Sequence, residues 1–118
     1  MALGAHDVLG ASVERTLIIT KDGHIAPQLE VLRHVESHES AHPVPDKRSL
    51  AAGQSLLRFL SELPRSVEPL FLISGGASSL VEVLEDGVTF EELGRLNAEG
   101  LASGISITEL RKDRKSVV

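Results

Sequence analysis

The sequence Ser74-Gly-Gly-Ala-Ser78 is the stretch whose residue types and spacing most suggest ligand binding. It follows a short apolar run, residues 69–73, and leads into further apolar residues from Leu80. Glycines let a backbone approach a ligand closely, and open amides at the start of a helix attract anions. The pattern therefore predicts a site for a phosphate or a carboxylate. A turn that contains glycine only because it is tight gives the same pattern, so both interpretations stay open.

Three well-known motifs are absent from this turn. No Gly-Lys-Ser/Thr follows it, as a Walker A loop requires, and the chain has no Gly-x-Gly-x-x-Gly dinucleotide fingerprint. The serines also lack the Gly-x-Ser-x-Gly context of a hydrolase nucleophile. We therefore interpret these serines as hydrogen-bond donors of an anion-binding turn.

The segment His42-Pro-Val-Pro-Asp46 is the second distinctive stretch. Two prolines fix the backbone around a histidine and an aspartate, which can position both side chains at a site. A plainer interpretation also holds, in which Asp46 caps a helix and His42 lies in a loop. His34, His38 and His42 are four residues apart, which would suit a metal site on a helix. The prolines argue against a helix there, and we predict no metal site.

A basic run, Arg111-Lys-Asp-Arg-Lys115, stands out in an otherwise acidic chain. Such a run is typical of a solvated helix face. One or two of its cations could instead reach an anionic ligand at the glycine turn.

Apolar runs and turn residues predict the elements that position these residues. Strands are expected at 15–20, 31–36 and 69–73. A first helix is expected to end at Gly10, and a second to run from an N-cap at Asp46 to Pro64. A third is expected to run from the glycine turn to about Leu84. A fourth is expected to start at the capping box Thr89-Phe-Glu-Glu92 and to end at Ser103-Gly104. One apolar helix face should consist of Leu50, Leu56, Leu57, Leu60 and Leu63.

Strands that alternate with helices predict an α/β fold. We expect a three-layer, Rossmann-like parallel sheet with flanking helices and right-handed crossovers. Three strands make a thin sheet, and both of its edges need cover from further sequence or from a partner. The sheet is therefore expected to be incomplete.

Composition excludes several classes of function. Twelve basic and seventeen acidic residues give a net charge of -5, and the chain has no Trp or Tyr, which argues against nucleic acid as a partner. The absence of cysteine excludes disulfides and thiolate zinc sites. No apolar run approaches the length of a membrane span, and the first residues do not have the pattern of a signal peptide. We therefore expect a cytoplasmic protein that is not bound to a membrane.

Taken in order, the motifs make this chain resemble the glycerate 2-kinase family, whose second domain is called MOFRL. The resemblance spans essentially the whole chain and follows the order and spacing of the family's first domain. The matching segments are Gly23-His24, His42-Pro-Val-Pro-Asp46, Ser74-Gly-Gly-Ala-Ser-Ser-Leu80, Gly87-Val-Thr89, Leu101-Ala-Ser-Gly-Ile-Ser-Ile107 and Arg114-Lys115.

This resemblance implies ATP-dependent phosphorylation of D-glycerate to 2-phosphoglycerate, with a divalent metal such as Mg²⁺. Glycerate and the nucleotide would bind between the α/β first domain, to which residues 1–118 would belong, and a second domain that is absent here. By match, the substrate or phosphate pocket would be lined by Ser74, Gly75, Gly76, Ala77, Ser78, His42 and Asp46, with cations from Arg114 and Lys115. The match assigns no catalytic residue.

The chain also departs from the family pattern. A Gly-Lys-Ala motif is expected upstream of Met1 and a Lys-Gly-Gly after Lys115, and both are absent. We therefore expect a fragment with little kinase activity alone, and a homo-oligomer or a complementing chain stays open. The alternative is a non-catalytic anion-binding remnant or module that acts with a partner chain. Hydroxypyruvate reductase, a name sometimes attached to the family, would need a nicotinamide fingerprint, which the sequence lacks.

Overall fold

The computed structural model describes residues 1–32 and 34–103. Its elements, in chain order, are α1 (Ala2–Leu9), the 3-10 helix η1 (Gly10–Ser12), β1 (Thr16–Lys21), α2 (Pro27–Glu30), β2 (Val35–Ser40), α3 (Lys47–Ser61), α4 (Ala77–Leu80) and α5 (Phe90–Ala102). No helix in the described ranges is long and apolar enough to cross a membrane.

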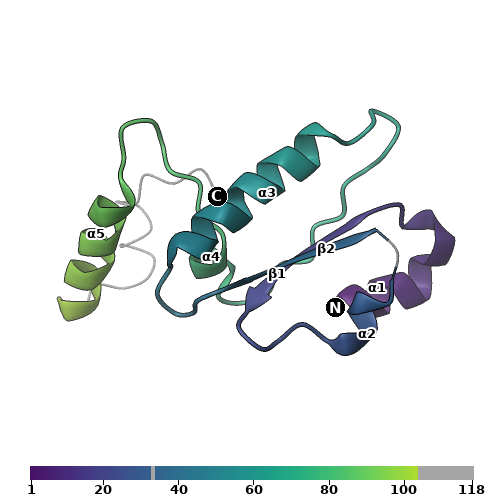
Figure 1. The fold of residues 1–118 in the computed structure, drawn as a ribbon, viewed down its shortest axis with the longest axis horizontal. Coiled ribbons are helices and arrows are strands. Elements are labelled where there is room, and N and C mark those ends of the chain that lie inside the picture. The colour runs from purple at the N-terminus through teal and green to yellow at the C-terminus, as the bar shows by residue number, and fades with distance from the viewer. Residues whose placement is uncertain (33, 104–118) are drawn as a thin grey trace.

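The sheet of the described chain consists of β1 and β2, which pair in parallel. The register runs from Thr16 opposite Val35 to Lys21 opposite Ser40. Helices flank both faces: Figure 1 shows α3 above the strands and α1 and α2 below them. The predicted α/β class, with an incomplete parallel sheet between helices, is therefore confirmed.

The first strand is predicted nearly to the residue, whereas the second lies four residues later than expected. α2 begins at Pro27, a residue suited to the first turn of a helix, and its end carries the chain into a turn at Val31 and Leu32. The apolar pair that suggested a strand therefore lies outside the sheet, and Val31 is 82% exposed. β2 instead uses the polar sequence Val-Glu-Ser-His-Glu-Ser.

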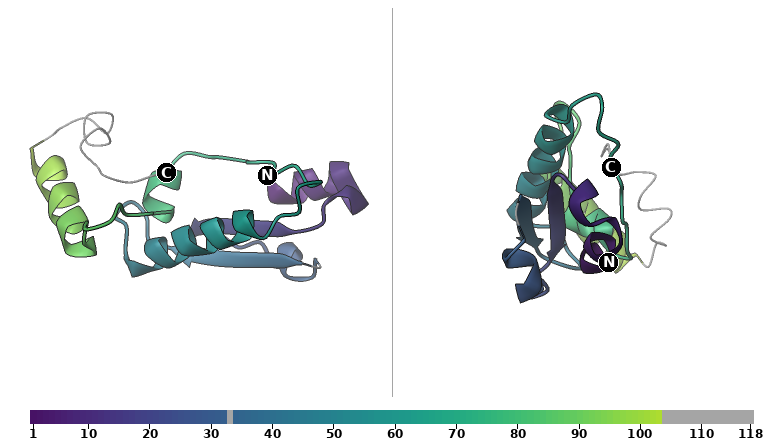
Figure 2. Two further views of the ribbon diagram at one scale, coloured as in Figure 1. Left: turned by 90° about the horizontal axis from the view of Figure 1, so that it is seen from above. Right: turned by 90° about the vertical axis from the view of Figure 1, so that its right-hand side faces the viewer.

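The expected third strand, at 69–73, is wrong for the described chain. Residues 67–74 are extended but join no ladder, and Leu70, Phe71, Leu72 and Ile73 are 64%, 54%, 45% and 74% exposed. A strand is defined by main-chain hydrogen bonds to a neighbouring strand, and this segment pairs with no strand of the described chain. Figure 2 shows this segment beside β1, on the side away from β2 and running in the same direction.

α3 begins and ends as predicted. Asp46 is its N-cap in a reciprocal capping box with Ser49, and the helix ends three residues before Pro64. The expected leucine face is confirmed only in part: Leu50, Leu56 and Leu60 are half-buried. The fully buried positions are small ones, namely Ser49, Ala52, Gly53 and Ser55. A Cβ on Gly53 would overlap the carbonyl oxygen of Glu82, so α3 packs backbone to backbone against residues 81–83. Leu57 is 49% exposed, and Leu63 lies beyond the helix.

The last two helices differ in how well the sequence predicts them. α4 ends at Leu80 rather than near Leu84, because Val81 is already extended. α5 begins at the predicted capping box of Thr89 and Glu92, and Ser103 is its C-cap as expected. The basic run with Arg114 and Lys115 lies outside the described residues.

Candidate functional site

Three loops meet at the carboxyl end of the sheet. Parallel strands end at the same edge, which brings together the turn after β1 and the loop after β2. The extended segment runs the same way, so its glycine turn reaches the same edge (Figure 2). Crevices at this edge are the usual ligand sites of open parallel sheets.

The imidazole of His42 lies directly against Gly76. A Cβ on Gly76 would overlap the His42 Nε2 atom, and the backbone there has φ 87°, which few residues other than glycine adopt. Ser79 fixes the turn, because its hydroxyl and its amide donate to the Gly76 carbonyl at 2.9 Å and 3.1 Å. The structure thus brings together the two stretches that the sequence singles out.

A buried serine that sequence reasoning missed joins the turn to α3. The Ser49 hydroxyl donates to the Ser79 carbonyl at 2.8 Å and accepts from the Asp46 amide at 3.3 Å. The Ser49 carbonyl accepts from the Glu82 amide at 3.0 Å. Both Ser49 and Glu82 are buried, at 0% and 1% exposure. The capping-box spacing hinted at Ser49, whereas Glu82 has no signal in the sequence.

Arg48 holds two aspartates at the rim of this edge. Its guanidinium donates to Asp22 at 3.0 Å and to Asp46 at 2.8 Å, and its amide donates to Asp46 at 2.9 Å. The hydrogen bond from Arg48 lowers the pKa of Asp22. Burial raises the pKa of Asp46, but the hydrogen bonds from the Arg48 side chain and backbone outweigh it and lower that pKa overall. Both carboxylates are therefore anionic and engaged.

The turn after β1 is also tied to β2. The Gly23 amide donates to the Glu39 carboxylate at 2.8 Å, and the His24 Nδ1 atom lies 2.8 Å from the Asp22 carbonyl. Ser40, the last residue of β2, is fully buried, and its hydroxyl has no hydrogen-bond partner in the described chain.

The remaining predicted residues lie around the glycine turn. Ser74 and Gly75 are exposed, and Ala77, Ser78 and Asp46 are partly buried. Among hydrogen bonds between described residues, none uses the amides of Gly75, Gly76 or Ala77 as donors. The four residues of α4 add only a short helix dipole, so anion binding at this turn would depend on its own amides.

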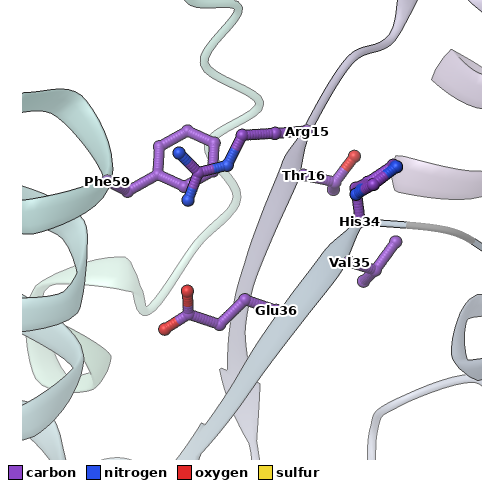
Figure 3. A pocket seen from close by; sticks show the side chains of 6 residues that line it. All are labelled: Arg15, Thr16, His34, Val35, Glu36 and Phe59. Atoms are coloured by element: carbon purple, nitrogen blue, oxygen red, sulfur yellow. The ribbon is translucent and has the colours of Figure 1, made fainter. Parts of the chain in front are cut away.

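A hollow lies at the opposite, amino end of the sheet (Figure 3). Arg15 stacks over the Phe59 ring, 4.9 Å from its centroid, and binds Glu62 at 3.1 Å. This hollow is lined by Arg15, Thr16, His34, Val35, Glu36 and Phe59, none of which the sequence singled out for the anion site. Within the described residues, no three histidine, aspartate or glutamate side chains are grouped to hold a metal ion.

Comparison with known proteins shows the following. The chain matches the family described as a domain of unknown function, DUF4147, over residues 1–117. A D-glycerate 2-kinase of Thermotoga maritima is 36% identical over 115 residues, which cover 98% of this chain and 27% of that protein. A glycerate 2-kinase of Pyrococcus horikoshii is 32% identical over 117 residues, which cover 99% of this chain and 25% of that protein.

A solved structure agrees with these matches. The crystal structure of glycerate kinase from Thermotoga maritima has a TM-score of 0.76 at 36% identity, over 93% of this chain and 26% of that one. An Agrobacterium vitis protein with the provisional name hydroxypyruvate reductase is 32% identical over 86% of this chain and 25% of its own length. The chain thus spans about a quarter of the length of the relatives that it matches.

Proposed function

This chain belongs to the DUF4147 family, and we propose that it forms part of the N-terminal α/β domain of a glycerate 2-kinase. Residues 1–118 belong to the first domain in this proposal, and the second domain lies outside the chain. The complete protein would transfer the γ-phosphoryl group of ATP to the 2-hydroxyl of D-glycerate, giving 2-phosphoglycerate and ADP. The chain alone would bind part of the substrate and catalyse little.

The contact between His42 and Gly76 is the observation that supports this proposal best. The two residues come from motifs far apart in the sequence, and the ring lies on a turn in which the amides of Gly75, Gly76 and Ala77 have no described acceptor. Backbone amides beside an exposed imidazole suit a small anion such as a phosphate or the carboxylate of glycerate. Phosphoryl transfer needs positioning and charge neutralisation above all, which such groups supply.

Each proposed site residue has a role that its environment permits. The amides of Gly75, Gly76 and Ala77 and the hydroxyls of Ser74 and Ser78 would donate to the anion. His42 would donate from its exposed ring. Two groups from outside the described residues, Arg114 and Lys115, would add positive charge.

Asp46 is better suited to positioning than to proton transfer. Its carboxylate accepts from both the backbone and the side chain of Arg48, which lowers its pKa. A base that is already hydrogen-bonded and weakly basic accepts a substrate proton poorly. We therefore assign Asp46 the task of holding α3 and Arg48 in place beside the glycine turn.

The described residues do not by themselves fit a Mg²⁺ site. Asp22 and Asp46 are acidic groups at this edge of the sheet, and both are bound to Arg48. Mg²⁺ prefers free carboxylates together with phosphate oxygens. ATP and its metal would therefore be held mainly by parts of the longer protein.

An anion-binding module without catalysis is the second candidate. It rests on the same glycine turn, in which the amides of Gly75, Gly76 and Ala77 donate to no described acceptor. Such a module would bind phosphate at the same turn and act through a partner chain. The two candidates share the binding step and differ in turnover.

A binding experiment tests the shared step. Titration of the ¹⁵N-labelled chain with inorganic phosphate, and then with D-glycerate, should shift the amide resonances of Gly75 and Gly76 saturably. His42→Ala should weaken the phosphate affinity about tenfold, as expected for a lost hydrogen bond to a charged group. His24→Ala is the matched control, because His24 is an exposed histidine on the neighbouring turn. Absence of shifts at the glycines would overturn both candidates.

A chimera separates them. This chain would replace the matching quarter of the Thermotoga maritima D-glycerate 2-kinase, and ADP release would be measured with and without D-glycerate. The kinase proposal expects glycerate-dependent ADP from the chimera and none from the isolated chain. A folded chimera that binds phosphate at the turn but releases no ADP would leave the binding module as the function.

A further inference from the structure

The outer edge of β2 pairs with no strand of the described chain. β1 separates it from the extended segment (Figure 2), so β2 borders the sheet on that side. The strand is regular over all six residues, without a bulge, and it contains no lysine or proline. Proteins commonly protect an exposed strand edge with such residues or with a bulge, because an open edge pairs readily with another chain. β2 therefore offers an edge that is suited to pairing.

Alternation along β2 shows which main-chain groups this edge offers. The Thr16 amide donates to the His34 carbonyl at 3.0 Å. Alternate residues of a strand bond to the same neighbour, so the main-chain groups of residues 34, 36 and 38 point to β1. The main-chain groups of Val35, Ser37 and Glu39 therefore point outward. Ser37, in the middle of this outward set, is exposed.

The side chains of Glu36 and His38 lie together on the face of β2 that α3 covers. The Glu36 Oε1 atom lies 2.9 Å from the His38 Nε2 atom and accepts from the guanidinium of Arg58, in α3, at 2.7 Å. The Glu36 side chain is 33% exposed and the His38 side chain 27%. A carboxylate has lone pairs for several donors, and the second ring nitrogen of His38 makes no hydrogen bond within the described residues. Both groups can therefore interact with a further chain.

The order Glu-Ser-His makes this edge complementary to a second copy of itself. Two copies of β2 that pair antiparallel about a two-fold axis at Ser37 place Glu36 of each copy opposite His38 of the other. Outward-pointing residues then oppose each other and exchange about six main-chain hydrogen bonds. Glu36 and His38 fall on the positions between these bonds, where opposite side chains come closest.

Charge selects this register among the neighbouring ones. An axis at Glu36 would oppose the two Glu36 carboxylates, and an axis at His38 would oppose the two imidazoles. Like charges directly opposite each other are destabilising, whereas a carboxylate opposite an imidazole is favourable. The axis at Ser37 also uses the whole outward set from Val35 to Glu39.

The edge is also less acidic than the rest of the chain. A net charge of -5 tends to keep two copies apart. At this edge, the hydrogen bond from His38 and the charge of Arg58 outweigh burial and lower the pKa of Glu36. Each Glu36 is therefore an anion that the guanidinium of its own chain already offsets. Two such edges can approach without strong repulsion.

We propose that two copies of this chain form a two-fold symmetric dimer through the outer edge of β2, antiparallel about Ser37, which joins their two sheets into one. The axis is perpendicular to the sheet, so the two α3 helices would lie on the same face. The glycine turns would lie at opposite ends of the dimer, which leaves both candidate anion sites open. The inference rests on the strand edge and its charges and does not depend on the proposed function.

Sedimentation equilibrium and hydrogen exchange of the whole 118-residue chain test the dimer. Sedimentation should show monomers that associate to dimers as the concentration rises. Between about 10 µM and about 1 mM protein, exchange of the Ser37 and Glu39 amides should slow about tenfold or more. The Leu72 amide is the internal control, because it belongs to the exposed apolar segment on the other side of β1. Its exchange should not change with concentration.

A pair of variants at the axis tests the main-chain contacts. Ser37→Pro removes the central outward amide, where proline is tolerated because the amide is not used within the sheet. It should keep the amide spectrum of the folded chain and weaken the dimer at least tenfold. Ser37→Ala keeps the amide and should keep the dimer.

A charge exchange tests the register. His38→Glu opposes carboxylates at both positions, and the double variant Glu36→Lys with His38→Lys opposes amines. Each should be monomeric alone, and an equimolar mixture should form a heterodimer, because every carboxylate then meets an amine. If the lysine variant fails to fold beside Arg58, the two Ser37 variants still decide the question.

Four outcomes would overturn the proposal. The first is a chain that stays monomeric at about 1 mM, a concentration at which even weak specific dimers form. The second is a dimer that protects the Leu72 amide and not the Ser37 amide. The third is a dimer that folded Ser37→Pro retains, and the fourth is a mixture of folded charge variants that stays monomeric. Phosphate shifts at Gly75 and Gly76 are a separate readout, so failure here leaves the proposed function testable.

Discussion

The residues before and after the glycine turn differ sharply in burial and in hydrogen bonding. After the turn, residues 79–82 are buried and hydrogen-bonded to the start of α3 through Ser49. Before the turn, residues 70–73 are exposed and have no hydrogen-bond partner among the described residues. We call residues 79–82, together with α3, the supported side of the turn, and residues 70–73 the unsupported side.

This difference indicates what the chain can and cannot build alone. The helical side is completed within the described chain, because Ser49 of α3 bonds to the Ser79 carbonyl and to the Glu82 amide. The strand side depends on a ladder, which needs a neighbour that this chain does not supply in its described part. A site that uses both sides is therefore half formed in the described chain.

The largest expected effect comes from overpacking the supported side. Gly53→Val places side-chain atoms where the Glu82 carbonyl lies, and this neighbour is backbone that cannot rotate away. We expect a loss of about 3 kcal/mol or more in the free energy of unfolding. Urea denaturation measures it as a lower transition midpoint.

Gly94→Ala is the control for this substitution. Gly94 lies in α5, and a Cβ there meets no atom within 4 Å. Alanine should therefore stabilise the chain by up to about 1 kcal/mol through helix propensity. Equal effects of the two substitutions would contradict the close contact between α3 and residues 81–83.

The next effect comes from the hydroxyl that joins α3 to the turn. Ser49→Ala leaves the buried Ser79 carbonyl without its donor and the Asp46 amide without its acceptor. We expect a loss of about 2 kcal/mol in the free energy of unfolding. Ser61→Ala, at an exposed hydroxyl that bonds only to its own helix, should change stability by less than about 0.5 kcal/mol. A stable Ser49→Ala protein would show that packing alone holds the supported side.

A pair of glycine substitutions separates backbone strain from ligand binding. Gly76 and Gly87 have nearly the same positive φ, 87° and 84°, but only Gly76 contacts His42. Alanine at either position should cost about 1 kcal/mol of stability. Only Gly76→Ala, and more strongly Gly76→Val, should abolish the phosphate-dependent shifts. Phosphate binding that survives at Gly76→Val would show that this glycine is purely structural.

The starts of α3 and α5 are the features that the sequence predicts well. Asp46 with Ser49 and Thr89 with Glu92 are capping boxes, whose physics is local and therefore readable from a few neighbouring residues. The approach of His42 to Gly76 follows from motif resemblance and not from any local rule. Arg48 as a bridge between Asp22 and Asp46 is a long-range contact, which no spacing in the sequence reveals.

The failures of prediction have separate physical causes. Residues 69–73 have the composition of a strand, but strand formation depends on a partner elsewhere, so composition alone misleads. The leucines of α3 suggested a broad apolar face, whereas close backbone approach selected Ala52, Gly53 and Ser55 for burial. Val31 and Leu32 read as a strand because the short helix α2 before them has no periodic signal of its own.

The smallest expected effect concerns the exposed charges of the supported side. Asp22 and Asp46 have folded pKa values below the usual 3.8, so the unfolded chain takes up protons first as the pH falls. Their stabilisation is therefore present at neutral pH, above the unfolded pKa, and is lost as the pH falls through the folded pKa.

Arg48→Met removes the partner of both carboxylates and should flatten this loss between about pH 5 and pH 2, as measured by urea midpoints across that range. The change should be small and should shrink with added salt, because the groups are largely exposed. Arg95→Met, at an exposed arginine of α5, should leave the pH profile unchanged. A uniform loss of stability at every pH in Arg48→Met would mean that this arginine acts through packing, and the contrast between the two sides of the turn would then rest on Ser49 and Gly53 alone.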